Sequence, residues 1–114
     1  MKTLNLFPAQ EQNEQLVTVN HGQAVTTSLK VAEYFGKDHA NVLKSIRSLD
    51  LSLPFNQVNF YLVEYTDQKG EQRPMYIMTR DGFTLLAMGF TGKKAMAFKI
   101  AYINAFNRME ETLR

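Results

Sequence analysis

No cysteine occurs among the 114 residues, and no apolar run is long enough to span a bilayer. Without cysteine the chain can form neither disulfides nor thiolate metal sites, which suits a reducing compartment. The apolar stretch within residues 1–8 is too short for a signal peptide. We therefore expect a cytoplasmic protein.

Residues that build catalytic centres are also scarce. The two histidines, His21 and His39, lie far apart in the sequence, and the acidic residues form no pair that would hold a divalent metal ion. No serine has an evident base partner. The sequence therefore predicts a protein that is not an enzyme and that uses no metal or cofactor.

The chain does have the composition of a folded domain, with 45% hydrophobic and 21% charged residues. Residues 1–15 are polar and lack periodicity, which predicts a flexible N-terminal arm, and residues 16–114 suffice for a single domain. The net charge is only +2, but residues 69–99 hold six basic side chains against two acidic ones. Such a local excess indicates either an anionic partner or an ordinary solvated surface.

The alternation of short elements predicts an α+β fold. Residues 16–26 are typical of a short β-hairpin with a glycine in its turn. Thr27 or Ser28 can cap a helix that ends at Gly36, and a second helix over residues 38–49 begins with an aspartate cap. Two short helices joined by a glycine-containing turn are typical of a helix-turn-helix.

The next elements extend this pattern. Residues 58–66 and 74–78 are rich in β-branched and aromatic side chains and flank a charged turn, which predicts a second hairpin. Thr79 can cap a third helix, and Thr91 can cap a last helix over residues 93–113. A helix pair followed by a hairpin predicts a winged helix-turn-helix-like domain, in which the hairpin is the wing.

The second helix has an aliphatic face and an opposite face that is small, polar and basic. Basic groups hold phosphates or guanine edges, and an amide can read adenine in the major groove. With polar residues near the ends of the first helix, this face supplies the candidate DNA-binding residues Thr27, Ser28, Lys37, Asn41, Lys44, Arg47 and Ser48. An ordinary polar helix surface is the alternative. His39 falls toward the aliphatic side, which favours a buried or capping role over base reading.

Cations at the hairpin tip and at the start of the last helix are further candidates for DNA binding. Lys69 and Arg73 would reach phosphates or the minor groove, although charged tips also protect edge hairpins against aggregation. Lys93 and Lys94 occupy a helix N-terminus, where the macrodipole disfavours cations. A DNA phosphate bound there would remove the conflict. Surface lysines without a role are the alternative.

The last helix carries two apolar stripes, of which a single core can use one. A broad stripe contains Tyr102 and Phe106. The second contains Met96, Ile100 and Ile103 and lies roughly 130° away on the helical wheel. It predicts packing either against the N-terminal strands or against a second copy in a homodimer.

Two segments of the chain together form a highly specific family signature: Met78-Thr79-Arg80-Asp81-Gly82-Phe83 and Gly89-Phe90-Thr91-Gly92-Lys93-Lys94. With their surroundings, over about residues 24–111, they resemble the phage regulatory protein Rha family. The resemblance implies a phage- or prophage-encoded regulator of phage development in the bacterial cytoplasm, from a family generally treated as DNA-binding. Many of its members carry a further domain after this one.

Two functions of different classes follow. The first is binding of double-stranded DNA to control transcription, with a homodimer as one way to use the second stripe. The second is a protein-interaction module, such as an antirepressor that acts on another phage or host regulator without direct DNA binding.

Overall fold

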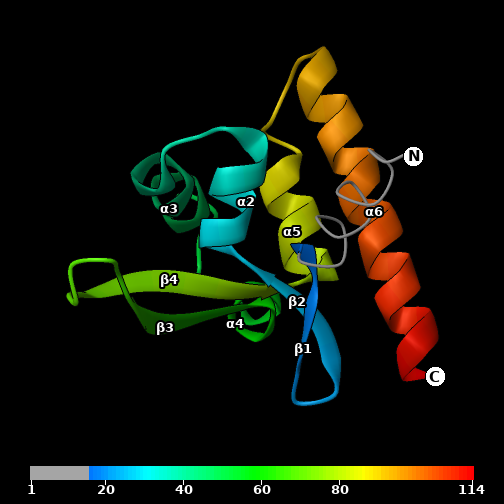
Figure 1. Cartoon of the computed structure of the whole chain (residues 1–114), viewed down its shortest axis with the longest axis horizontal. Coiled ribbons are helices and arrows are strands. Elements are labelled where there is room, and N and C mark those ends of the chain that lie inside the picture. Colours follow the sequence, from blue (N-terminus) through cyan, green and yellow to red (C-terminus); the bar gives the residue numbers. More distant parts are fainter. Residues whose placement is uncertain (1–15) are drawn as a thin grey trace.

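The computed structural model describes residues 16–114, which form an antiparallel four-stranded sheet and five helices (Figure 1). The α+β class expected from the sequence is confirmed. The arm predicted at residues 1–15 lies outside the described residues. In chain order the elements are β1 (Thr18–Asn20), β2 (Gln23–Thr27), α2 (Ser28–Phe35), α3 (His39–Arg47), α4 (Pro54–Asn59), β3 (Phe60–Thr66), β4 (Gln72–Thr79), α5 (Arg80–Ala87) and α6 (Lys93–Leu113).

The sheet has the strand order β1-β2-β4-β3, so β2 and β4 join its two hairpins. β2 pairs with the end of β4, where Val25 lies opposite Thr79. β3 pairs with β4 along its full length, beginning with Phe60 opposite Met78. The strand before the helix pair and the hairpin after it therefore belong to one sheet, which fixes the β3–β4 hairpin relative to α2 and α3.

The largest buried side chains come from the last helix. Tyr102 and Phe106 of α6 are at most 1% exposed. The Tyr102 ring stacks on Phe83 of α5, with ring centroids 4.4 Å apart, and on Phe35 of α2. Its hydroxyl lies 3.4 Å from the hydroxyl of Thr26 in β2, and burial raises the pKa of Tyr102. The broad stripe of α6 thus holds α2, α5 and the sheet together.

Polar caps set the starts of two helices as the sequence predicts. The Thr27 hydroxyl accepts a hydrogen bond from the backbone N–H of Lys30 in the first turn of α2. The Thr79 hydroxyl does the same for the N–H of Gly82 in α5. α2 ends at Gly36, whose φ of +68° is a left-handed conformation that suits glycine.

Two other predicted caps are wrong. Asp38 occupies the N-cap position of α3, but its side chain makes no capping hydrogen bond, and α3 ends at Arg47 rather than near residue 49. The N-cap of α6 is Gly92, not Thr91, because the chain enters this helix with a φ of +102° that glycine tolerates best.

Helix α4 was not predicted, and it corrects the expected start of the hairpin at residue 58. Its exposed residues alternate with two buried asparagines. Asn56 donates from its side chain to the carbonyls of Leu49 and Asp50, and Asn59 donates to a carbonyl within α4. These bonds satisfy backbone carbonyls next to the end of α3, so they favour a helical turn over the strand that β-propensity suggests.

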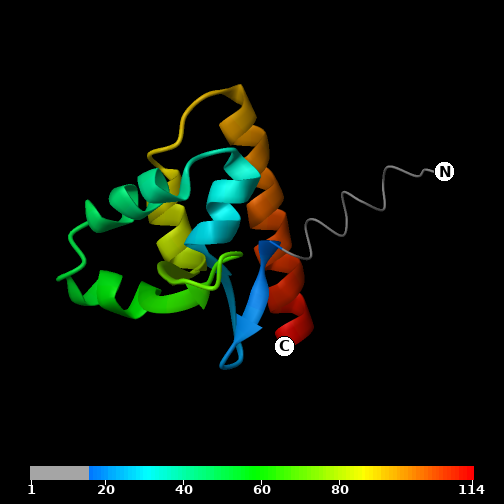
Figure 2. The same cartoon turned by 60° about the vertical axis from the view of Figure 1, so that its left-hand side comes forward.

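Helices α3 and α6 lie on opposite sides of the molecule, with α2 and α5 between them in both views (Figures 1 and 2). None of the helices within residues 16–114 combines the length and the hydropathy that crossing a membrane requires.

Candidate nucleic-acid interface

Helix α3 separates its side chains as its periodicity predicts. Val42, Leu43 and Ile46 are buried in the core. The opposite face is open to solvent, and its exposed residues are Ala40, Asn41, Lys44, Ser45, Arg47 and Ser48. At 100° per residue, Lys44 points directly away from the core. Both exposed cations lie in the last turn of α3, where they complement the helix dipole.

A groove of about 580 Å³ runs between α3 and the end of α5. Its α3 wall is polar and is lined by Lys37, Asp38, Asn41, Ser45 and Ser48. Its α5 wall is apolar and includes Leu85, Gly89 and Phe90. The Lys37 ammonium lies 4.7 Å from the centre of the Phe90 ring, which ties the α2–α3 turn to the loop after α5. Asn41 and Ser48 thus face a concave strip beside the exposed cations.

The groove adds residues that sequence reasoning missed. Ser45 shares a face of α3 with Asn41 and Ser48, so the helical wheel could have found it. The residues from α5 carried no such signal, because their position beside α3 depends on how the two helices pack. Among the predicted contacts, Asn41, Ser48 and Lys37 come together here.

Ser28 is not a surface residue, so its prediction as a DNA contact is wrong. It is 0% exposed. Its hydroxyl accepts the backbone N–H of Tyr76 in β4 at 2.9 Å and lies 2.8 Å from Nε2 of His39 in α3. Ser28 therefore joins the starts of α2 and α3 to the hairpin. Thr27 also uses its hydroxyl internally, as the cap of α2.

His39 turns inward, as its place on the helical wheel suggests. Its ring is half-buried and meets the ring of Tyr65 in β3 edge-on, with centroids 5.9 Å apart. Desolvation lowers the pKa of His39, and the charge of Glu33 opposes this in part. With Ser28, His39 fixes the N-terminus of α3 against the hairpin.

Acidification should weaken the fold through His39. Because the folded state lowers the pKa of His39, the unfolded chain binds its proton more readily as pH falls below the ordinary value of about 6.5. The contribution of His39 to stability is thus complete above that value and is lost below it. Denaturant unfolding from pH 7.5 to 5 should show a smaller decline for His39→Gln than for the natural chain. His21→Asn, in an exposed turn, is the control. Identical declines in all three proteins would contradict this role.

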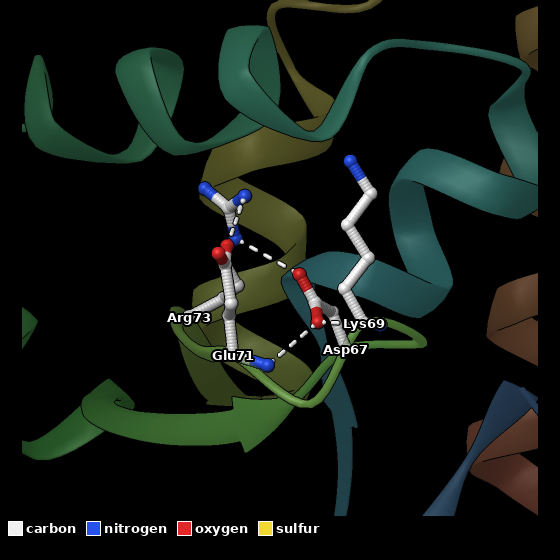
Figure 3. Close-up of polar contacts among 4 residues, drawn as sticks. All are labelled: Asp67, Lys69, Glu71 and Arg73. Carbon is white, nitrogen blue, oxygen red and sulfur yellow. Dashed lines mark hydrogen bonds and ion pairs between the residues drawn. The ribbon is translucent and has the colours of Figure 1, made fainter.

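The tip of the β3–β4 hairpin is organised by Asp67 (Figure 3). Its carboxylate accepts the backbone N–H groups of Glu71 and Lys69, both at 2.9 Å, and the Nε–H of Arg73 at 3.1 Å. These bonds, the one from Glu71 foremost, lower the pKa of Asp67. Arg73 also pairs with the Glu71 carboxylate at 3.0 Å.

These contacts separate the two predicted cations of the tip. Arg73 is held by two carboxylates, and these bonds raise its pKa. The Lys69 side chain extends away from those carboxylates in Figure 3 and forms no ion pair within residues 16–114. Lys69 is therefore the better placed of the two for an outside anion.

Lys93 and Lys94 are both exposed in the first turn of α6. That turn has neither an acidic residue nor a side-chain cap. The partial positive charge of its backbone N–H groups therefore adds to the full positive charges of the two ammonium groups. The loop that leads into it begins at Phe90, under Lys37. Binding of a phosphate at this helix start stays a prediction.

Comparisons with known proteins place the chain among phage-related sequences. The family model for the phage regulatory protein Rha matches residues 26–111. An uncharacterised protein of Haemophilus influenzae is 42% identical over 91% of this chain and 62% of its own length. An uncharacterised 22.8 kDa protein from the gp15–gp3 intergenic region of Salmonella phage P22 is 43% identical over 88% of this chain and 51% of its own length.

A third relative is the SPbeta prophage-derived protein YoqD of Bacillus subtilis, whose name describes it as a candidate antirepressor. It is 33% identical over 89% of this chain and 43% of its own length. The chain thus spans less than two thirds of each of these three relatives. No solved structure matches the chain significantly.

Proposed function

The chain belongs to the phage regulatory protein Rha family, and on that premise we propose that it binds double-stranded DNA to control transcription during phage development. The DNA-binding unit is a winged helix-turn-helix-like arrangement of α2, α3 and the β3–β4 hairpin. α3 enters the major groove as the recognition helix, and the hairpin is the wing. The site of action is the cytoplasm of the bacterial host.

The observation that carries this proposal is the open face of α3. Lys44, Arg47 and Asn41 are exposed together, and no described element covers them. This combination supplies phosphate contacts and an amide that can read a base edge. The hydrogen bond between Ser28 and His39 and the contact of His39 with Tyr65 connect α3 to the wing, which supports recognition by the two elements together.

The wing contributes one cation in this arrangement. Lys69 is the phosphate contact, whereas Arg73 shapes the tip through Asp67 and Glu71. Lys37, which lines the groove together with Asn41, adds a positive charge to that strip. The proposal therefore predicts a modest number of phosphate contacts rather than a large electrostatic surface, in keeping with a net charge of only +2.

A salt series of duplex binding tests the proposal. Affinity for duplex DNA should fall linearly with salt on logarithmic axes. Lys44→Ala should weaken binding to all sequences and reduce the salt slope by about one. Asn41→Ala should leave the slope unchanged and relax preference at one base pair, in sequences selected from a random duplex pool. An absence of duplex binding even at low salt would refute the proposal, and equal losses from both variants on every sequence would refute base reading by Asn41.

A second candidate function, binding to another regulator, is favoured by a different surface. Four large apolar side chains on and around α4 and β3 are 50% to 62% exposed: Leu53, Phe55, Val58 and Leu62. Exposed apolar groups gathered on neighbouring segments are typical of protein interfaces. The name of the Bacillus subtilis relative is consistent with such a role. A protein that binds no duplex but loses a regulator partner on Phe55→Asp would support this alternative.

A further inference from the structure

Helix α6 carries a second row of apolar side chains that the described fold does not use. Met96, Ile100 and Ile103 are 56%, 50% and 47% exposed. The same helix buries Tyr102 and Phe106 on its other side, so the exposure is confined to one face. The N-terminal strands, one of the two partners expected from the sequence, leave this row open.

The spacing of the row extends beyond its apolar centre. Steps of three and four residues connect Lys93, Met96, Ile100, Ile103, Asn107 and Glu110. This alternation is the seam of a coiled coil, in which every such residue faces the partner helix. The seam is apolar in its middle, basic at its first position and acidic at its last.

We propose that α6 pairs with α6 of a second copy of this chain in an antiparallel, two-fold symmetric dimer. With the axis between residues 101 and 102, Ile100 lies opposite Ile103 of the second copy. Met96 then meets Asn107 of the second copy, and Lys93 meets Glu110. The apolar layers are central, and the charged layers close both ends.

The charge pattern favours this direction over the parallel one. A parallel pair in register would place Lys93 against Lys93, which is repulsive, and would bring no unlike charges of the two seams together. The antiparallel pair opposes unlike charges and brings each basic helix start to the negative end of the other helix dipole. Lys93, unfavourable in an isolated helix, becomes favourable in the dimer.

Glu110 also has a partner within its own chain, so in the dimer Lys93 of the second copy and Arg80 share its carboxylate. Its carboxylate accepts two bonds from Arg80 of α5, at 2.8 and 3.1 Å, and Arg80 also donates to Asn107. Two of the six seam residues are thus held by a residue outside α6. Because α3 lies on the opposite side of the molecule, the dimer leaves both recognition helices free (Figures 1 and 2). Lys94, about 100° from Lys93 on the wheel, also stays available to a phosphate.

Two facing helices form an interface at the small end of the usual range, so we expect a reversible dimer with a Kd of roughly 1 to 100 µM. Sedimentation equilibrium of the full chain, without DNA, should show a monomer–dimer equilibrium. Ile100→Asp should weaken it by about 10-fold or more, because it places a charge in the central layer. Leu62→Asp, which charges an apolar residue on β3 that is even more exposed than Ile100, is the matched control and should have no effect.

Cross-linking tests the direction, and the absence of natural cysteine makes the result unambiguous. A mixture of Met96→Cys and Asn107→Cys proteins should form the mixed disulfide on oxidation. Neither variant alone should cross-link, because like positions are about 16 Å apart along the antiparallel axis. A monomer at every concentration, a dimer broken by Leu62→Asp rather than Ile100→Asp, or efficient self-cross-linking of either variant would overturn the proposal. None of these outcomes depends on DNA binding.

Discussion

Reversing both exposed cations of α3, with Lys44→Glu and Arg47→Glu together, is expected to lower affinity for duplex DNA by about 100-fold or more at moderate salt. Each reversal removes an attraction and adds a repulsion against the same phosphate backbone. Both side chains are exposed, and neither has an ion-pair partner within residues 16–114, so the fold should not change. Fluorescence anisotropy of a labelled duplex measures the loss, and circular dichroism checks the fold.

The matched control separates a local contact from general charge. Arg108→Glu with Arg114→Glu changes net charge equally, near the end of α6 and at the residue that follows it, off the proposed seam. This control should reduce affinity only slightly, and the difference should shrink as salt screens long-range attraction. Equal losses in the two double variants would mean that the chain attracts DNA through its overall charge, and α3 would lose its role as the recognition helix.

The sequence predicts the buried and exposed faces of α3 and α6 well, because both depend on short-range periodicity. The burial of Val42 and Ile46 against the exposure of Lys44 follows from a repeat of 3.6 residues, which any helix must express. The capping of α5 by Thr79 is equally local, since the hydroxyl and the N–H it binds are three residues apart. Such features need no knowledge of the rest of the chain.

The features that sequence reasoning missed depend on contacts that only the folded chain brings together. Ser28 resembles a polar surface residue, but the N–H that it accepts belongs to Tyr76, 48 residues away. α4 was missed, and its last two residues were predicted as strand, because the carbonyls near the end of α3 that the Asn56 side chain satisfies cannot be read from local propensity. The acidic partners of Arg73 are close in sequence, yet only the folded turn directs them to it.

One long-range contact also explains why position 82 requires glycine. Gly82 lies in the first turn of α5, where its N–H is bound by Thr79. A Cβ added there would lie 2.5 Å from the backbone oxygen of Asn59 and 3.2 Å from the Met78 side chain. That oxygen cannot retreat, because the Asn59 side chain is bonded both to Thr79 and to the carbonyl of Phe55. Only glycine lets α5 approach the start of β3 this closely.

Gly82→Ala should therefore destabilise the protein by about 2 to 3 kcal/mol, although replacing a helical glycine by alanine ordinarily stabilises a helix by up to about 1 kcal/mol. The sign of the change is the test. Gly89→Ala is the control, since its added Cβ would meet only the Leu86 carbonyl, at 3.6 Å, and it should be neutral or slightly stabilising. Thermal unfolding should show a fall in Tm of roughly 10 °C for Gly82→Ala alone. A Gly82→Ala protein as stable as Gly89→Ala would mean that α5 can move away from Asn59 and that position 82 does not require glycine.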